Sequence, residues 1–363
     1  MLQSRNDHRP RPLWQYISIM LVCPLGVAGL IVLIGPAAAG GGPPAPACRA
    51  ETIRVATYNI EHMSKMLNVA LVKPNNRTRE QWADFFSDEE DCYEVAWVIT
   101  QAAAAPDILL IQEGCSQDEL EHFNTHWLRQ AYAYVKVFRG NSPRGQHLGI
   151  LAKKGFEPLE VREFADEVDP VDDPALRKLK EGGGLAEKNL LFSRGPAFVK
   201  FRTPGGHVMW VGNTHVKSKY GNSLPVVKWR IREMQRTREI CGELLARGDT
   251  PYLLLGGDFN DDMQLDEFEK TLGRDALSVI TGGQDREQLT NLTSPLIRAN
   301  PRGGTYHARV KTKYPAAWFD YLFASPDLAR HVRRTTLIDA PLAGVASDHL
   351  PVVTEIALPG RKP

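Results

Sequence analysis

The sequence has almost no net charge, and its few cysteines lack metal-binding spacing. The 44 Lys and Arg residues nearly balance 43 Asp and Glu residues, leaving a formal charge of +1, so any attraction to a polyanion must come from a local patch. The five cysteines include no CxxC pair, which argues against a structural zinc site. An internal repeat and a heptad pattern are also missing, which argues against solenoid and coiled-coil architectures.

Long apolar runs are missing too, with one exception near the N-terminus. That stretch extends from Ile17 to about Ala39, follows three arginines and ends in small residues. The pattern is typical of an export signal cleaved after Ala39, with a retained membrane anchor or a buried hairpin of a cytosolic protein as alternatives. With a signal or an anchor, the rest of the chain lies outside the cytoplasm, in the periplasm or the extracellular medium.

Four cysteines remain after such a cleavage, namely Cys48, Cys92, Cys115 and Cys241. An oxidising compartment permits one or two disulfides among them. The sequence does not choose among the three possible pairings, and four buried free thiols are equally compatible with it.

The sequence motifs extend over nearly the whole chain, which favours one large domain. We expect a Gly/Pro-rich linker at residues 40–51, a domain at residues 52–357 and a frayed tail at residues 358–363. The composition, 43% hydrophobic and 24% charged, is that of a globular protein with ample material for a core.

Eight apolar runs predict strands of a mixed α/β fold. They are Thr52–Tyr58, Asp107–Gln112, His147–Lys153, Pro196–Arg202, His207–Thr214, Leu253–Gly257, Phe319–Ala324 and Leu350–Ile356. Helical spacing predicts helices at Arg79–Ala104 and Pro225–Ala246, and Asp166–Lys188, which has no clear period, is expected to be an insertion loop.

The second predicted helix has a clear apolar side. Its buried stripe should consist of Val227, Ile231, Met234, Cys241 and Leu245. We therefore expect its basic residues, Lys228, Arg230, Arg232, Arg236 and Arg238, to form a solvated face.

Compact acids follow or interrupt several of the predicted strands at turns. Glu61, Glu113, Asp258 and Asp348 are the strongest of them as candidate metal ligands. Carboxylate oxygens suit magnesium, manganese or calcium, whereas imidazole and thiolate clusters suit zinc or copper. The pattern predicts a hard divalent cation.

Amide and imidazole side chains accompany these acids. Asp258 and Asn260, two residues apart on an extended segment, point the same way and are suited to holding a water molecule. As an imidazolium, His349 could donate to a phosphate oxygen, with Asp320 orienting its ring. His215 is a second candidate donor. This set is typical of phosphate ester hydrolysis.

The ordered motifs resemble the endonuclease/exonuclease/phosphatase superfamily, which includes deoxyribonucleases, abasic-site endonucleases, sphingomyelinases and inositol polyphosphate 5-phosphatases. The matching pieces are TYNIE, IQE, NTH, GDFN, the pair Thr305 and Tyr306, FDYLF and SDH. They span about Ile53 to Ile356, and GDFN and SDHLPV are the most specific. The resemblance implies a four-layer sandwich, in which two mixed β-sheets pack face to face and helices cover the outer faces.

The resemblance also implies roles for individual residues. Glu113 would be the principal metal ligand, and the full ligand set would be Asn59, Glu61, Glu113 and Asp348. Many members of the superfamily have Asp where this chain has Glu61, so the longer side chain would alter how the metal is held.

The remaining implied roles concern the reacting groups. Asp258 and Asn260 would position or deprotonate the attacking water, and His349, paired with Asp320, would bind the scissile phosphate. His215 would stabilise the developing charge or protonate the leaving group.

The segment NTHVKSK resembles the matching strand of secreted bacterial nucleases. Strand alternation would place Lys217 and Lys219 on the face of His215, where both could contact a phosphate backbone. We therefore favour an exported, Mg²⁺-dependent nuclease, with Mn²⁺ or Ca²⁺ as other cations and no stable protein partner implied. A lipid or sugar phosphate hydrolase, such as a sphingomyelinase-like enzyme acting on phospholipid, and a non-catalytic binding protein on the same fold are the alternatives.

Overall fold

The computed structural model describes residues 48–61, 89–142, 145–180, 188–219, 221–282, 288–307 and 315–360. The chain divides into two units, Met1–Pro44 and Ala45–Pro363, and all described residues belong to the second. The predicted export segment lies outside the described residues. Among those that are described, no helix combines the length and apolarity needed to cross a bilayer.

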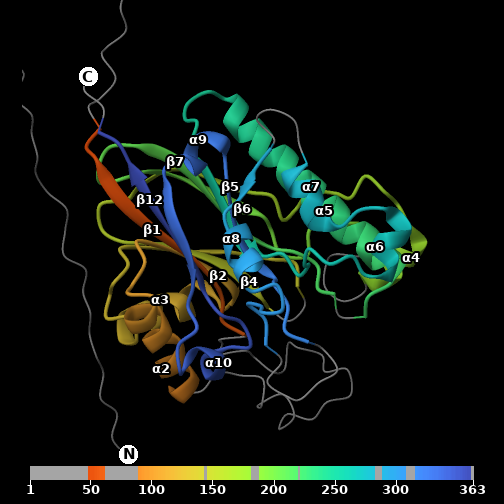
Figure 1. Cartoon of the computed structure of the whole chain (residues 1–363), viewed down its shortest axis with the longest axis horizontal. Helices are drawn as coiled ribbons and strands as arrows, with labels where there is room; N and C mark the ends of the chain where they lie inside the picture. The colour runs from red at the N-terminus through yellow and green to blue at the C-terminus, as the bar shows by residue number, and fades with distance from the viewer. Residues whose placement is uncertain are drawn as a thin grey trace, which may run out of the picture. The chain divides into compact units, whose positions relative to one another are not determined.

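Two six-stranded mixed sheets form the centre of the second unit (Figure 1). The first has the order β11-β12-β1-β2-β4-β3 and consists of β1 (Glu51–Asn59), β2 (Ile108–Gly114), β3 (Tyr134–Phe138), β4 (His147–Ala152), β11 (Val332–Leu337) and β12 (Val352–Leu358). The second has the order β5-β6-β7-β8-β10-β9 and consists of β5 (Glu157–Glu163), β6 (Ala197–Arg202), β7 (Val208–His215), β8 (Leu253–Asp258), β9 (Thr290–Asn291) and β10 (Asp320–Ala324).

Helices lie on the outer side of each sheet (Figure 1). Beside the first sheet are α2 (Glu89–Trp97) with its π-helical continuation η1 (Val98–Ala102), α3 (Gln117–His126) and α10 (Ala343–Ala346). Beside the second are α4 (Pro174–Leu179), α5 (Leu224–Ala246), α6 (Glu267–Leu272) and α7 (Ala276–Thr281). Two further short helices are α8 (Ser294–Ala299) and α9 (Pro326–Ala329).

Alternation along the central strands divides the core into three apolar layers. In β1, Ile53 and Val55 join the layer between the sheets, whereas Ala56 and Tyr58 pack toward α2 and α3. In β8, Leu254 faces the same central layer and its neighbours face α5. Successive strand side chains point to opposite faces, so both sheets are buried on both sides. The predicted four-layer sandwich is confirmed.

All eight predicted strands are present, with boundaries within a few residues of those expected. The structure adds β3, β5, β9 and β11, which are the outermost strands of the two sheets. The predicted helix Pro225–Ala246 corresponds to α5, and the described part of Arg79–Ala104 is helical through α2 and η1. Residues 79–88 of that prediction lie outside the described part of the chain.

Two expectations about the second unit need correction. The segment Asp166–Lys188 contains α4, whose N-terminus is capped by Asp173, and Lys180 at its end makes a fully buried ion pair of 3.0 Å with Asp169. The predicted stripe of α5 is buried, but Arg230 is buried as well and is not solvated. Its guanidinium meets acids from outside α5, so helical spacing alone could not reveal its burial.

Candidate active site

Several predicted site residues meet at one edge of the two sheets because strand ends coincide there. Asn59 ends β1 and pairs in register with Gln112 of the parallel strand β2. His215 and Asp258 end β7 and β8, which are parallel and in register. Asp320 begins the antiparallel strand β10 directly opposite Asp258. Strand pairing therefore brings together side chains that are far apart in sequence.

The backbone leaves extended geometry at this edge. Glu61, Glu113 and Asn260 have positive φ angles of 48°, 55° and 48°, a conformation that is strained for residues other than glycine. Gly257 precedes Asp258 with a φ of 152°, and a Cβ there would lie 2.0 Å from the carbonyl oxygen of Thr214. Close approach of β7 and β8 thus requires glycine beside the catalytic candidate.

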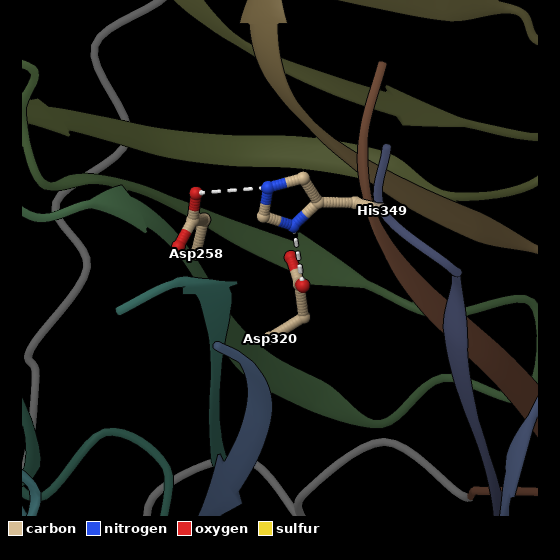
Figure 2. A group of neighbouring side chains, drawn as sticks. All are labelled: Asp258, Asp320 and His349. Atoms are coloured by element: carbon tan, nitrogen blue, oxygen red, sulfur yellow. Dashed lines mark hydrogen bonds and ion pairs between the residues drawn. The ribbon is translucent and has the colours of Figure 1, made fainter. Parts of the chain in front are cut away.

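His349 lies between two carboxylates (Figure 2). Its Nδ1 is 2.7 Å from Oδ2 of Asp320, and its Nε2 is 3.9 Å from Oδ2 of Asp258. Burial disfavours the charged ring, but Asp320 and Asp258 outweigh this effect and raise the pKa of His349 well above its ordinary value. His349 is therefore suited to remain an imidazolium and donate to an anionic oxygen.

His215 is in a contrasting environment on the other side of Asp258. Its Nε2 is 3.2 Å from Oδ2 of Asp258 and 3.9 Å from Oε1 of Glu113. Burial and the charge of Arg194 lower the pKa of His215, although the carboxylates oppose this shift. The two imidazoles flank one aspartate and are pushed toward different protonation states, an arrangement suited to acid and base roles.

Glu61 connects two of the other predicted metal ligands, Asn59 and Asp348. Its backbone N–H donates to Oδ1 of Asn59 at 3.1 Å, and its Oε2 accepts the N–H of Asp348 at 3.0 Å. Asp348 lies 3.8 Å from the His349 ring, and Glu113 lies 3.9 Å from the His215 ring. The side chains of Glu113 and Asp348 are partly exposed, at 15% and 24%. This set of carboxylate and amide oxygens fits a hard divalent cation with water ligands.

A second grouping of possible ligands lies deeper. One ligand atom each from Asp258, Asp320 and His349 can be chosen within 4.8 Å of one another. However, Asp320 already bonds the His349 ring, and Asp258 accepts the side-chain amide of Asn59 at 3.0 Å and the N–H of Asn260 at 2.8 Å. These hydrogen bonds already occupy oxygens of both aspartates, whereas the carboxylates of Glu113 and Asp348 are partly exposed.

The two predicted phosphate-binding lysines do not lie as expected. Strand β7 ends at His215, so its alternation does not extend to Lys217 and Lys219. The ammonium of Lys219 lies 2.6 Å from Oδ1 of Asp261, with Glu269 at 3.8 Å. The side chain of Lys219, which is 20% exposed, is thus paired with two buried acids, and of the two lysines we retain Lys217 as a candidate substrate contact.

The motifs contain further polar residues that support the site and whose roles the sequence did not indicate. Gln112 of β2 donates to Asn213 of β7 at 2.7 Å, which connects the two sheets, and to Thr57 of β1 in its own sheet at 3.0 Å. The hydroxyl of Thr305 accepts the N–H groups of Phe319 and Asp320 and holds the start of β10. Gln112 and Asn213 lie inside the motifs IQE and NTH, which are the sequence signal that could have identified them.

The family model described as the Endonuclease/Exonuclease/phosphatase family matches residues 56–349. This range contains most of the chain and all of the site, so the protein belongs to that family. Its members are phosphoester hydrolases that depend on a divalent metal. No curated protein sequence gives a significant match.

Solved structures show the same fold at low sequence identity. Truncated TDP2 from Caenorhabditis elegans is 16% identical, with a TM-score of 0.54 over 85% of this chain and 98% of that one. A mannosyl-6-phosphatase from Bacteroides thetaiotaomicron is 16% identical, with a TM-score of 0.54 over 84% and 100% of the two chains. TDP2 from D. rerio, complexed with a single-strand DNA product, is 14% identical, with a TM-score of 0.52 over 84% and 98%.

Proposed function

We propose that this protein is an exported, Mg²⁺-dependent phosphodiesterase that acts on nucleic acid. The observation that carries the proposal is the position of His349, a buried ring held by Asp320 and directed toward Asp258, beside the partly exposed Asp348. A charged donor adjoining a group of hard oxygen ligands suits the binding of an anionic phosphate ester.

Each residue of the site has a separate role in the proposed hydrolysis. Asp258, which accepts the backbone N–H of Asn260, is placed to orient or deprotonate an attacking water. His349 donates to a non-bridging phosphate oxygen, and His215 stabilises charge or, after receiving the proton that Asp258 takes from the attacking water, protonates the leaving oxygen. A cation held by Asn59 and the carboxylates of Glu61, Glu113 and Asp348 would polarise the phosphate and neutralise developing charge.

Nucleic acid is favoured as the substrate by the segment NTHVKSK, which resembles secreted bacterial nucleases. Within it Lys217 lies two residues beyond His215, where a cation could contact the phosphate next to the scissile one. The likeness in fold to a TDP2 complexed with single-strand DNA supports the same choice. The likeness to a mannosyl-6-phosphatase, with a TM-score of 0.54 against 0.52 for that TDP2, makes a sugar phosphate the second candidate. Export rests on the apolar segment Ile17–Ala39.

A substrate panel tests the proposal. Purified protein is offered duplex DNA, single-stranded DNA, RNA, mannose 6-phosphate and sphingomyelin, each with Mg²⁺, Mn²⁺ or Ca²⁺ and with EDTA. We expect hydrolysis of a nucleic acid that requires a divalent cation and stops with chelator. His349→Ala should abolish the same activity, which excludes a contaminating nuclease.

Other results would contradict particular parts of the proposal. Preference for mannose 6-phosphate would replace the nuclease by a phosphatase, and turnover of sphingomyelin would indicate a lipid phosphodiesterase. Full activity in EDTA would exclude a requirement for a divalent metal. Mg²⁺ binding without hydrolysis of any ester would favour a binding protein on the same fold.

A further inference from the structure

A fully buried carboxylate lies behind the proposed reacting groups. Glu233, on α5, is 1% exposed, and each of its two oxygens accepts a backbone N–H. Oε1 accepts from Ser193 at 3.1 Å, and Oε2 accepts from Lys217 at 2.7 Å. One side chain therefore joins the segment before β6 to the segment after β7.

The segment after β7 is held at further points. The N–H of Val216 donates to the carbonyl of Asp258 at 2.9 Å. The carbonyl of Val216 accepts the guanidinium of Arg194 at 3.0 Å and the side-chain amide of Asn260 at 3.2 Å. Val216 is thus bonded to the segment before β6 through Arg194 and to the end of β8 through Asp258 and Asn260.

An aromatic residue of α5 adds to the same arrangement. Trp229, one helical turn before Glu233, donates its indole N–H to the carbonyl of Leu191 at 2.6 Å. The ammonium groups of Lys180 and Lys217 lie 5.3 Å and 5.9 Å from the centre of its ring, within the range of cation–π attraction. Glu233 therefore binds the backbone of Lys217, and Trp229 contacts its side chain.

We propose that Glu233 is a positioning residue for His215 and Lys217, an inference that rests on the proposed function. Its carboxylate fixes the backbone just beyond His215, and through it the distance from the His215 ring to Asp258 and to the substrate. Glu233 lies behind the site and contacts neither the reacting atoms nor the proposed cation ligands.

A carboxylate is required here because two N–H groups must be accepted at once. Burying a charge is unfavourable unless hydrogen bonds compensate for it, so packing alone would be better served by an apolar or amide side chain. Glutamine in the same place offers one oxygen and turns its NH₂ group toward the second N–H. Glu233→Gln therefore keeps the volume and releases one of the two segments.

The experiment compares Glu233→Gln with two variants of α5. Glu233→Asp keeps both acceptor oxygens but is one methylene shorter, and Glu243→Gln removes an exposed carboxylate that pairs with Arg236. For Glu233→Gln we expect kcat to fall about 10- to 100-fold, the range for a displaced catalytic group. KM should rise by a smaller factor than kcat falls, because Lys217 is a proposed substrate contact, and the Mg²⁺ concentration for half-maximal activity should stay unchanged. Glu233→Asp should be intermediate, and Glu243→Gln should behave as the wild type.

Amide hydrogen exchange gives a readout that does not depend on activity. In Glu233→Gln, protection should fall in peptides covering residues 191–194 and 216–219 and stay unchanged in β8 and β10. Unaltered exchange at residues 191–194 and 216–219, or faster exchange throughout the domain, would overturn the inference. Wild-type kcat in Glu233→Gln would overturn it as well. An inactive wild-type protein would overturn the proposed function instead. The exchange measurement would still show whether Glu233 holds the two segments.

Discussion

Two charged clusters meet just at and after the end of β8, where Asp258 is the last strand residue and Asp261 follows three positions later. The Asp258 cluster comprises Asp258, His215, Asp320 and His349 and lies at the strand ends. The Asp261 cluster comprises Asp261, Lys219, Arg230 and Glu269 and lies between α5 and α6. Neighbouring residues of the motif GDFND thus serve different parts of the molecule.

The clusters differ in the kind of cation that faces the acids. In the Asp261 cluster, Arg230 lies 3.4 Å from Asp261 and 3.2 Å from Glu269, and its charge is permanent. In the Asp258 cluster the ion-pair partners of Asp258 and Asp320 are imidazoles, whose charge depends on a proton. Permanent pairs suit a structural role, whereas partners that gain and lose protons suit chemistry.

The largest expected effect follows from exchanging the central acid of the Asp258 cluster. Asp258→Asn removes the charge between the two imidazoles and should lower kcat at least about 1,000-fold, within the range for loss of an acid–base group. Because asparagine keeps one oxygen that accepts a hydrogen bond, the free energy of unfolding should fall by less than about 3 kcal/mol, the loss typical of a broken buried ion pair. Steady-state kinetics and urea unfolding on the same preparations check both parts. An active Asp258→Asn enzyme would show that the cluster is structural.

The opposite behaviour is expected in the Asp261 cluster. Arg230→Met leaves Asp261 and Glu269 buried without their guanidinium and should lower the free energy of unfolding by about 3 kcal/mol, as for other broken buried pairs. The kcat of the folded fraction should remain near that of the wild type. Arg236→Met, on the same helix, removes a partly exposed pair with Glu167 and should change stability by about 1 kcal/mol or less. Equal losses in the two variants would contradict the comparison.

A smaller effect is expected when a proposed metal ligand is weakened but not removed. Glu113→Gln keeps one oxygen donor and loses the negative charge, so the Mg²⁺ concentration for half-maximal activity should rise about tenfold. At saturating Mg²⁺ much of the activity should return. Activity measured over a Mg²⁺ titration separates this from the Asp258→Asn variant, which added metal should not rescue. An unchanged titration curve would remove Glu113 from the ligand set.

How much of the fold could be predicted depended on the position of each strand in its sheet. The eight predicted strands are the interior ones, because strands buried on both faces read as continuous apolar runs. The edge strands β3, β5, β9 and β11 escaped prediction. In β5, for example, Glu157, Glu160 and Arg162 interrupt any apolar pattern, because an edge strand with a solvated face needs no such run.

Whether a site residue could be predicted depended on its position in the sequence. Residues at strand ends within ordered motifs, such as Asp258 and His349, could be found because the chemistry is concentrated in short segments. Glu233 and Arg230 could not, since each meets partners from separate parts of the chain. Their positions on α5 show only that they adjoin the apolar stripe, and the sequence does not reveal which acids, amides or bases will face them.

The smallest expected effect concerns pH and lies in the Asp261 cluster. Burial and the charge of Asp261 raise the pKa of Glu269 from 4.5 to about 7. Between these values the folded protein holds a proton that the unfolded chain has released. Stability from this group is therefore complete below pH 4.5 and is lost as pH rises through 7.

Glu269→Gln tests this sign because glutamine cannot lose that proton. Relative to the wild type, the variant should gain stability between pH 5 and pH 8, by about 1 kcal/mol or less because the nearby cations Lys219 and Arg230 oppose the charge of the buried carboxylate. Urea unfolding midpoints at the two pH values measure the difference, and Glu267→Gln, at an exposed position of the same helix, should show no such gain. If Glu269→Gln and the wild type have parallel pH profiles, Lys219 and Arg230 must neutralise Glu269 completely. The Asp261 cluster would then be insensitive to protons, and the contrast with the histidines around Asp258 would be sharper still.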